Sequence, residues 1–309
     1  MTHSKLPSWP VWREAAFSAL VALLFIAWSA PAAHSGPLKR RGKHEGSVER
    51  VVFYSTSLDA DEKYRIYLPP GYATSGGRRY PVVYLLHGLQ GTDRDFFVYG
   101  ELHKTLDRLI QSGTIQPMIV VGANGGESYW SNHIGTAANP GPKYRDYIVK
   151  DLVSTIDRRY RTRASGQYRA IAGVSMGGYG ALSVALENPN DFAAGVSLSG
   201  ALFLEAPSHR KVYLKVWGDP PNPGYFNKTS PIHLMRNLPE GSRSPGIYLH
   251  CGDRDSLGFL KYALEAHKIL KSRRVPHALR VTGGGHTWDV WGGQAPDWLR
   301  WVDKKFKRN

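Results

Sequence analysis

A serine in a glycine-rich turn is the first candidate for chemistry in this sequence. Residues 173–177 read Gly-Val-Ser-Met-Gly and match the pattern G-x-S-x-G. The apolar run 170–172 before them is typical of a strand, and the residues after them favour a helix. Glycines two positions either side of the serine allow strand and helix to approach closely in such a sharp turn. The pattern predicts that Ser175 is a nucleophile, and a glycine-rich turn with a capping serine is the alternative.

A serine hydroxyl is a weak nucleophile until a neighbouring base removes its proton. His286 fits the base, because it follows three glycines and the strand-like run 278–281. A loop histidine that caps the last helix is the alternative. Two carboxylates, Asp253 and Asp255, follow the run 246–251, where an acid that orients the histidine is expected. We expect Asp255 to be this acid, because the acid usually lies a few residues beyond the strand end. Asp253 is then a turn or helix-capping residue, which is also the alternative for Asp255.

Two backbone N–H groups are predicted to stabilise the negative charge that develops when the serine attacks a carbonyl. Met176 directly follows the serine and would begin a helix whose N-terminal amides point at the site. Leu89 lies in the loop 87–91, His-Gly-Leu-Gln-Gly, after the apolar run 80–86. The glycines of this loop allow it to fold close over the serine, whereas a plain glycine-rich turn is the alternative.

Three more side chains are predicted to contact a substrate. Gln90 belongs to the loop 87–91, Trp130 follows the apolar run 118–123, and Trp288 lies beside His286. Aromatic rings at the carboxyl edge of a sheet could stack on a sugar or an aryl acid. Packing of these loops against the core is the alternative. The spacing of the histidines predicts neither a metal site nor a cofactor, since no H-E-x-x-H or comparable pattern occurs.

The elements that must position these residues alternate along the chain. Strands are predicted at 47–55, 64–68, 80–86, 118–123, 168–172, 193–198, 246–251 and 278–281, the first two forming a hairpin with a turn at 59–61. Helices are predicted at 100–111, 144–160, 176–186, 257–270 and 296–306. This alternation predicts an α/β fold in one domain, 47–309, with a mostly parallel central sheet and helices on both faces. The stretch 202–238, rich in proline, glycine and aromatics, is predicted to be an insertion that covers the pocket.

The N-terminal residues have the pattern of an export signal. A positively charged start is followed by the apolar run 15–30 and by small residues at two possible cleavage points. The run is shorter than the ~20 residues of a spanning helix, which favours a cleaved signal peptide over residues 1–35. An uncleaved anchor is the alternative, and it would be the only membrane contact. Either interpretation predicts a secreted or periplasmic protein, with a flexible lead-in at 36–46.

Composition excludes some partners. Forty Lys and Arg stand against 25 Asp and Glu, for a formal net charge of +15. The basic residues are dispersed and no nucleic-acid motif accompanies them, so the charge is interpreted as a property of the surface and no nucleic-acid partner is expected. The single cysteine, Cys251, allows no intrachain disulfide and is predicted to be a small buried hydrophobe.

Together these segments resemble the putative-esterase family of α/β-hydrolases, which includes feruloyl and acetylxylan esterases, S-formylglutathione hydrolases, enterochelin esterases and mycolyltransferases. The resemblance rests on residues 67–72, 84–88, 170–178, 251–257 and 283–288. The last two blocks look most like feruloyl esterase modules. The resemblance implies the α/β-hydrolase fold, a triad of Ser175, Asp255 and His286, and Leu89 and Met176 as oxyanion donors.

The expected function is that of a secreted serine esterase, which hydrolyses a carboxylic ester through an acyl-enzyme. Its substrate would be a small-molecule or polysaccharide-linked ester, such as a feruloyl or acetyl ester of the plant wall. Acyl transfer to a sugar or lipid, as in the mycolyltransferases, is one alternative. A catalytically inactive wall-binding protein is the other. The acyl group, the alcohol and the oligomeric state stay open at this point.

Overall fold

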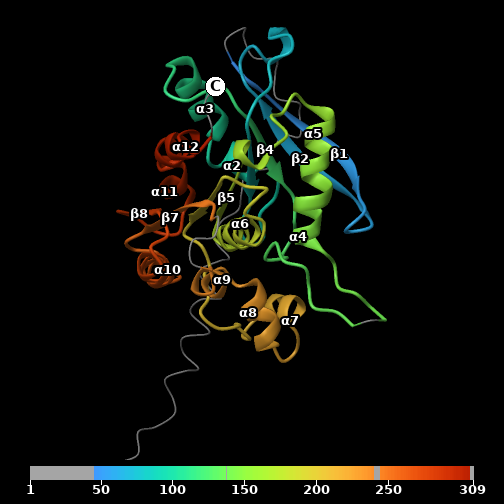
Figure 1. The fold of residues 1–309 in the computed structure, drawn as a ribbon, viewed down its shortest axis with the longest axis vertical. Coiled ribbons are helices and arrows are strands. Elements are labelled where there is room, and N and C mark those ends of the chain that lie inside the picture. The colour runs from blue at the N-terminus through green and yellow to red at the C-terminus, as the bar shows by residue number, and fades with distance from the viewer. Residues whose placement is uncertain (1–44, 137, 240–243, 307–309) are drawn as a thin grey trace, which may run out of the picture. The chain divides into compact units, whose positions relative to one another are not determined.

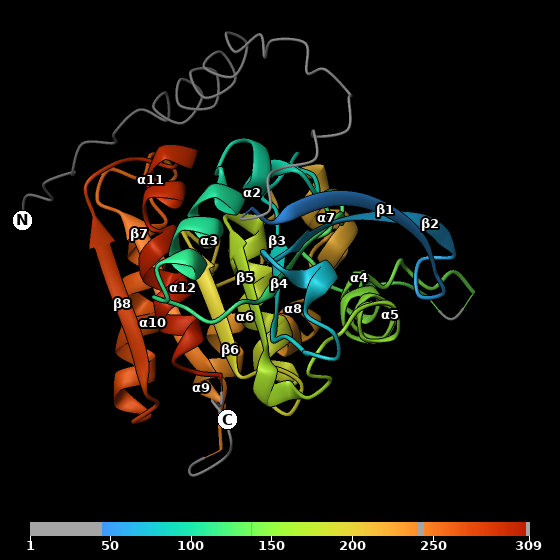
Figure 2. The same ribbon diagram turned by 90° about the horizontal axis from the view of Figure 1, so that it is seen from above.

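A sheet of eight strands in the order β1-β2-β4-β3-β5-β6-β7-β8 forms the centre of the structure, which is a computed structural model (Figure 1). The strands are β1 (Ser47–Ser55), β2 (Ala60–Leu68), β3 (Val82–Leu86), β4 (Ile119–Ala123), β5 (Arg169–Val174), β6 (Ala194–Leu198), β7 (Gly246–Gly252) and β8 (His277–Thr282). Strand β2 pairs antiparallel with β1 and β4, and all other neighbours pair parallel. The predicted α/β fold with a mostly parallel sheet is confirmed. Figure 2 shows β1 and β2 at one end of the sheet and β8 at the other.

The structure describes residues 45–136, 138–239 and 244–306. The predicted signal peptide, residues 1–35, lies outside the described residues, as does the predicted lead-in apart from Glu45 and Gly46. Gly46 is buried, and its N–H donates to Asp107 Oδ1 over 2.9 Å. None of the described helices is both long enough and apolar enough to cross a lipid bilayer.

Helices cover both faces of the sheet because its central strands are apolar on both faces. In β3, Val82, Tyr84 and Leu86 belong to one buried cluster, and Val83 and Leu85 to the other. The second cluster is covered by α2 (Asp95–Val98), α3 (Leu102–Gln111), α11 (Trp288–Gly293) and α12 (Ala295–Asp303). The first is covered by η2 (Tyr147–Leu152), α5 (Val153–Arg159), α6 (Met176–Glu187), α10 (Leu260–Ser272) and the helices of the 202–238 stretch. Two single turns, η1 (Tyr72–Thr74) and η3 (Gly166–Tyr168), complete the set.

The predicted hairpin turn and the predicted helix 144–160 differ in kind from the structure. The hairpin turn occupies residues 56–59, because β2 begins at Ala60 and pairs with Ser55. The prediction of a turn at 59–61 was wrong. The charged residues at the start of β2 lie in an outer strand and face solvent, which gives them the polar pattern of a turn. The predicted helix 144–160 consists of α4 (Tyr144–Asp146), the π-helical η2 and α5. A hydrophobic period of 3.6 residues does not distinguish a π-helical turn from an α-helical one.

The stretch 202–238 between β6 and β7 forms three short helices that were not predicted. They are α7 (Lys211–Trp217), α8 (Pro223–Thr229) and α9 (Pro231–Arg236). Proline is the first residue of both α8 and α9, where its missing N–H costs no hydrogen bond. Aromatic side chains of this stretch pack closely, and the Trp217 ring lies 5.1 Å from Tyr129 and 5.8 Å from Tyr179. The insertion is therefore held to the core by aromatic contacts.

Candidate active site

Ser175 stands at the sharp turn between β5 and α6. Its backbone has φ 55° and ψ −117°, in the positive-φ region that a non-glycine residue adopts only under constraint. Its N–H donates to the Leu198 carbonyl at the end of β6 over 2.9 Å, and its carbonyl accepts from the Ala201 N–H over 3.1 Å. The strained turn is thus fixed by main-chain hydrogen bonds to the neighbouring strand and the loop after it.

The glycines of the G-x-S-x-G pattern are required by close contacts. A Cβ on Gly173 would lie 2.1 Å from the Gly177 carbonyl oxygen. A Cβ on Gly177 would lie 1.9 Å from the Leu86 carbonyl oxygen, at the end of β3. Because no side chain fits at either point, the spacing of the two glycines around Ser175 follows from the approach of β5, α6 and β3.

Asp255 and His286 form a hydrogen-bonded pair. The Nδ1 atom of His286 lies 2.7 Å from Oδ2 of Asp255, and the carboxylate is fully buried. Oδ1 of Asp255 accepts from the N–H groups of Leu257, at 3.0 Å, and Phe259, at 3.5 Å. Burial acts to raise the pKa of Asp255, but the hydrogen bond and charge of His286 and these two N–H groups lower it below the usual value. The ionised carboxylate only accepts, so Nδ1 carries the proton and Nε2 remains free to take one.

Asp253 has a different partner. Its Oδ1 accepts the N–H of Gly284 over 2.8 Å, and the Arg254 N–H donates to the Gly284 carbonyl over 2.9 Å. Asp253 therefore holds the backbone of the glycine loop that carries His286, while Asp255 faces the imidazole ring. Of the two carboxylates that the sequence left in competition, Asp255 is the one in contact with the histidine.

Ser175, Asp255 and His286 lie at one edge of the sheet. They follow the carboxyl ends of β5, β7 and β8, and β5, β6, β7 and β8 are consecutive parallel neighbours. In the part of the chain that the structure describes, the Ser175 hydroxyl makes no hydrogen bond to the His286 ring. Such hydrogen bonds are often long before substrate binds. The structure thus joins Asp255 to His286 directly and brings Ser175 to the same edge.

The loop after β3 lies against the serine and is fixed by His87. A Cβ on Gly88 would lie 3.4 Å from the Ser175 Cβ. The Nε2 atom of His87 accepts the Gly125 N–H over 3.1 Å, so Nδ1 carries the proton and donates to the Gly88 carbonyl over 2.7 Å. In a trans peptide the N–H of the next residue points opposite to this carbonyl. The Leu89 N–H is therefore turned away from His87.

The two predicted oxyanion donors are both available. Met176 is the first residue of α6, where an N–H has no acceptor within the helix. Among the hydrogen bonds of the described residues, neither the Leu89 N–H nor the Met176 N–H donates to another group of the protein. Two unoccupied backbone donors are the groups that would be needed to stabilise an oxyanion formed by attack of Ser175.

Trp130 supports the loop after β3 and is fully buried. Its Nε1 donates to the His87 carbonyl over 3.2 Å, and its ring lies 4.9 Å from the imidazole of His87. Its side chain has no exposed surface for a substrate, so the structure supports the alternative of loop packing. Pattern reading missed His87, although it stands next to Gly88 in the sequence.

The other two predicted substrate contacts differ in exposure. Gln90 is exposed and has φ 61°. Trp288 is half-buried, and its ring lies 5.2 Å from both Phe96 and Trp291. Gln90 therefore belongs to the solvent-facing part of the loop after β3, whereas Trp288, the first residue of α11, packs against Phe96 of α2.

Two aromatic rings stand perpendicular to the ring of the catalytic candidate His286. The Trp291 ring lies 4.8 Å away at an interplanar angle of 88°, and Phe259 lies 5.4 Å away at 87°. Phe203 of the insertion extends this buried aromatic cluster, 6.0 Å from Phe259 and 5.8 Å from Tyr262. The contacts of Phe203 could not be predicted, because the stretch 202–238 shows only weak periodicity.

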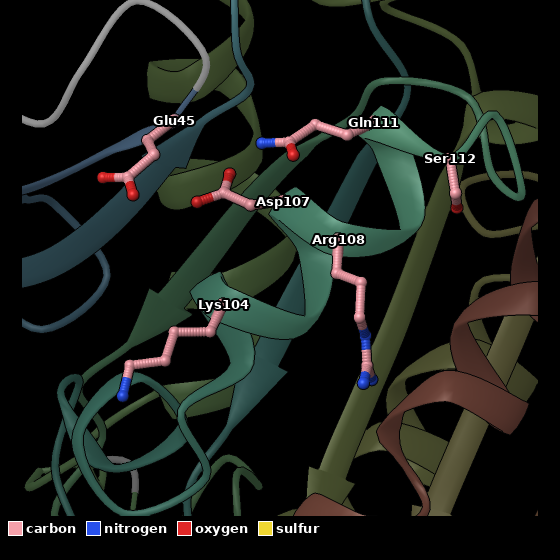
Figure 3. A pocket seen from close by; sticks show the side chains of 6 residues that line it. All are labelled: Glu45, Lys104, Asp107, Arg108, Gln111 and Ser112. Carbon is pink, nitrogen blue, oxygen red and sulfur yellow. The ribbon is translucent and has the colours of Figure 1, made fainter.

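A polar hollow of about 600 Å³ lies elsewhere, over α3. Figure 3 shows side chains of α3, among them Lys104, Asp107 and Arg108, together with Glu45. Tyr67, which donates to Asp107 over 2.7 Å, pairs with Val120 near the start of β4. The hollow thus lies toward the amino-terminal edge of the parallel strands and shares no lining residue with the candidate site. Within the described ranges, no three His, Cys, Asp or Glu side chains gather as metal ligands would.

Comparisons with known proteins agree on one family. The family described as "Putative esterase" matches residues 55–302. An endo-1,4-beta-xylanase/feruloyl esterase of Xylanibacter ruminicola is 31% identical over 198 residues, which cover 62% of this chain and 27% of that protein. Esterase Rv1288 of Mycobacterium tuberculosis is 36% identical over 161 residues, 52% of this chain and 34% of that one. The chain thus spans about a quarter to a third of these curated relatives. A solved ferulic acid esterase is 26% identical with a TM-score of 0.73, covering 85% of this chain and 99% of that chain.

Gly173→Ala should lower the free energy of unfolding by about 1–3 kcal/mol or prevent folding, because the new methyl group meets the Gly177 carbonyl. Gly77→Ala is the matched control, since its Cβ would meet nothing within 4 Å. Urea unfolding of both variants measures the effect. Equal stability of the two variants would contradict the close approach of β5 and α6.

The free energy of unfolding should fall as the pH drops from about 6.5 to about 4. Burial lowers the pKa of His87 from 6.5 to about 4, so the unfolded chain binds more protons in this window. His87 alone would account for a loss on the order of 3 kcal/mol. Burial lowers the pKa values of His133 and His250 to about 4 as well, with the same sign. Urea unfolding at pH 7 and pH 4.5 measures the difference, and a flat profile would show that these rings are not buried and neutral.

Proposed function

Because the chain belongs to the putative-esterase family, we propose that it is a serine esterase that hydrolyses a carboxylic ester through an acyl-enzyme. The observation that carries the proposal is the 2.7 Å hydrogen bond between His286 Nδ1 and the buried Asp255 carboxylate, at the sheet edge where Ser175 occupies its strained turn. A histidine with its Nδ1 proton fixed in this way presents Nε2 as a base.

The reaction begins at Ser175. Nε2 of His286 takes the hydroxyl proton while Oγ attacks the ester carbonyl carbon, and Asp255 stabilises the imidazolium that forms. The carbonyl oxygen gains negative charge and accepts from the Leu89 and Met176 N–H groups, each of which contributes on the order of 3 kcal/mol. Collapse of this intermediate expels the alcohol, which takes the proton from Nε2, and leaves the acyl group on Oγ.

Hydrolysis of the acyl-enzyme repeats these steps with water as the nucleophile. His286 removes a proton from the water, which attacks the acyl carbon, and the same two N–H groups bind the second oxyanion. Release of the carboxylic acid returns the proton to Ser175. No step requires a group from outside the chain other than ester and water.

The substrate is proposed to be a feruloyl or acetyl ester, free or linked to an extracellular polysaccharide such as the plant wall. The 26% identity to a ferulic acid esterase supports an aromatic acyl group, as do the aromatic rings of Phe259, next to His286, and of Phe203, next to Phe259. The export pattern of residues 1–35 supports a secreted or periplasmic enzyme.

Substitutions of the two neighbouring carboxylates should separate their roles. Asp255→Asn should reduce kcat on p-nitrophenyl acetate by about 10⁴-fold, because the histidine loses its fixed tautomer. Asp253→Asn keeps an oxygen that accepts the Gly284 N–H and should cost less than about tenfold. Ser175→Ala should abolish turnover with a nearly unchanged melting temperature. The reverse order of the two carboxylates, or an active Ser175→Ala variant, would overturn the assignment.

A panel of methyl ferulate, p-nitrophenyl acetate and a long-chain p-nitrophenyl ester should show the highest kcat/KM on the feruloyl or the acetyl substrate. Liquid chromatography of the products distinguishes free acid from acyl transferred to an added alcohol or sugar. Transfer without free acid would favour an acyltransferase. Inertness on every ester, with strong glycan binding, would favour an inactive wall-binding protein.

A further inference from the structure

A row of three buried side chains, Ser199, Cys251 and Trp291, lies next to the Asp255–His286 pair. Trp291 Nε1 donates to the Ser199 hydroxyl oxygen over 3.0 Å. The Ser199 hydroxyl also acts on the Cys251 thiol, whose pKa it lowers as a proton donor would. The Cys251 sulfur lies 3.6 Å from Oδ2 of Asp255, the same oxygen that accepts from His286. Ser199 and Cys251 are fully buried, and Trp291 is 7% exposed.

The direction of these hydrogen bonds is fixed by their two ends. An indole N–H only donates, and an ionised carboxylate only accepts. Ser199 therefore accepts from Trp291 and keeps its own proton for the neighbouring thiol, and the Cys251 S–H donates to Asp255. Burial and the nearby Asp255 charge raise the pKa of Cys251 to about 12, so the thiol keeps the proton that it donates. Hydrogen bonds that run in one direction strengthen one another.

Trp291, at one end of this row, also contacts His286 directly. The Trp291 ring stands perpendicular to the His286 ring at 4.8 Å, while its Nε1 begins the chain that ends at Asp255. Phe259 also stands perpendicular to the imidazole, at 5.4 Å. One side chain, Trp291, thus limits the rotation of the base by packing and supports the acid through hydrogen bonds.

Ser199 also links this row to the nucleophile. Its neighbour Leu198 accepts the Ser175 N–H over 2.9 Å, and its own N–H donates to the His250 carbonyl over 2.7 Å. Ser199 has φ 46°, which is strained for a serine. Leu198 therefore fixes the turn of Ser175, and the next residue, Ser199, accepts the hydrogen bond of Trp291.

We propose that Ser199, Cys251 and Trp291 are positioning residues that hold the Asp255–His286 pair in a fixed place relative to Ser175. The inference rests on the proposed function, because it assumes that the pair activates the serine. It assigns a role to the only cysteine of the chain, which composition alone describes as a small buried hydrophobe.

The test uses Trp291→Phe, Ser199→Ala and Cys251→Ala with the double variant Ser199→Ala/Cys251→Ala. Each single change interrupts this row of contacts and should lower kcat on p-nitrophenyl acetate about three- to tenfold with KM within twofold. The double variant should lose no more than Cys251→Ala alone, because both changes interrupt the same chain. Losses that multiply would show that the residues act independently and would overturn the proposal.

The pH profile of kcat/KM separates positioning from general stability. Removal of the Cys251 donor leaves more negative charge on Asp255 for His286, so the kinetic pKa of the histidine should rise in Cys251→Ala. Cys251→Ser, which keeps a proton donor, should restore most of the lost kcat and the original profile. The serine variant also serves if the alanine variant does not fold. An unchanged profile in Cys251→Ala would count against the proposal.

Two control variants remove the same groups elsewhere. Trp301→Phe changes an indole that packs on Tyr248, and Ser55→Ala removes a buried hydroxyl that donates to Asp151. Both should keep the wild-type kcat, even where the melting temperature falls. A loss in these controls as large as in Ser199→Ala would mean that any buried change lowers activity, and would overturn the inference.

A readout without turnover distinguishes failure of this inference from failure of the proposed function. The Nδ1 proton of His286 should shift in the proton NMR spectrum of Cys251→Ala and not in that of Ser55→Ala. A wild-type protein inactive on every ester would refute the esterase assignment alone if this shift were still seen. An active wild type, with kcat, pH profile and NMR signal unchanged in all three single variants, would refute only the positioning role of Ser199, Cys251 and Trp291.

Discussion

The architecture of the site depends on one close approach, at which β5, α6 and the end of β3 meet without room for a side chain. Gly173 and Gly177 occupy this point, and Ser175 takes a strained backbone between them. The strain is tolerated because the Ser175 N–H donates to the Leu198 carbonyl and the Ser175 carbonyl accepts from the Ala201 N–H, which fixes the turn. The arrangement exposes a serine at the head of a helix, and every later element of the site is placed relative to it.

Polar groups around this point are arranged by donors and acceptors that have only one possible role. A backbone N–H on Nε2 determines the tautomer of His87, and a carboxylate on Nδ1 determines that of His286. His87 then orients the peptide that carries the Leu89 N–H, while His286 is left with a free Nε2. Both rings thus carry the proton on Nδ1, but Nε2 is engaged by a backbone N–H in His87 and free in His286.

Much of this could be predicted from the sequence, since apolar runs, glycine spacing and strand-end residues are local signals. The strands β3 to β8 lie where continuous apolar runs were found, and Asp255 lies beyond the end of its strand as expected. Trp130 could not be assigned correctly, because an aromatic residue in a loop reads the same whether it faces a substrate or His87. The three helices of the 202–238 stretch escaped prediction since each has at most seven residues, too few to show a period.

The position of the chain's single thiol has a consequence for how the protein meets oxidants. Thiolates react with peroxides and disulfides, and Cys251 is both shielded from solvent and held as the neutral thiol. Neither sulfenic acid formation nor dimerisation through a mixed disulfide is open to the folded molecule. Reagents that alkylate sulfur would reach Cys251 only when β7 and its loops separate, so the rate of alkylation is an intrinsic measure of how often the fold opens there.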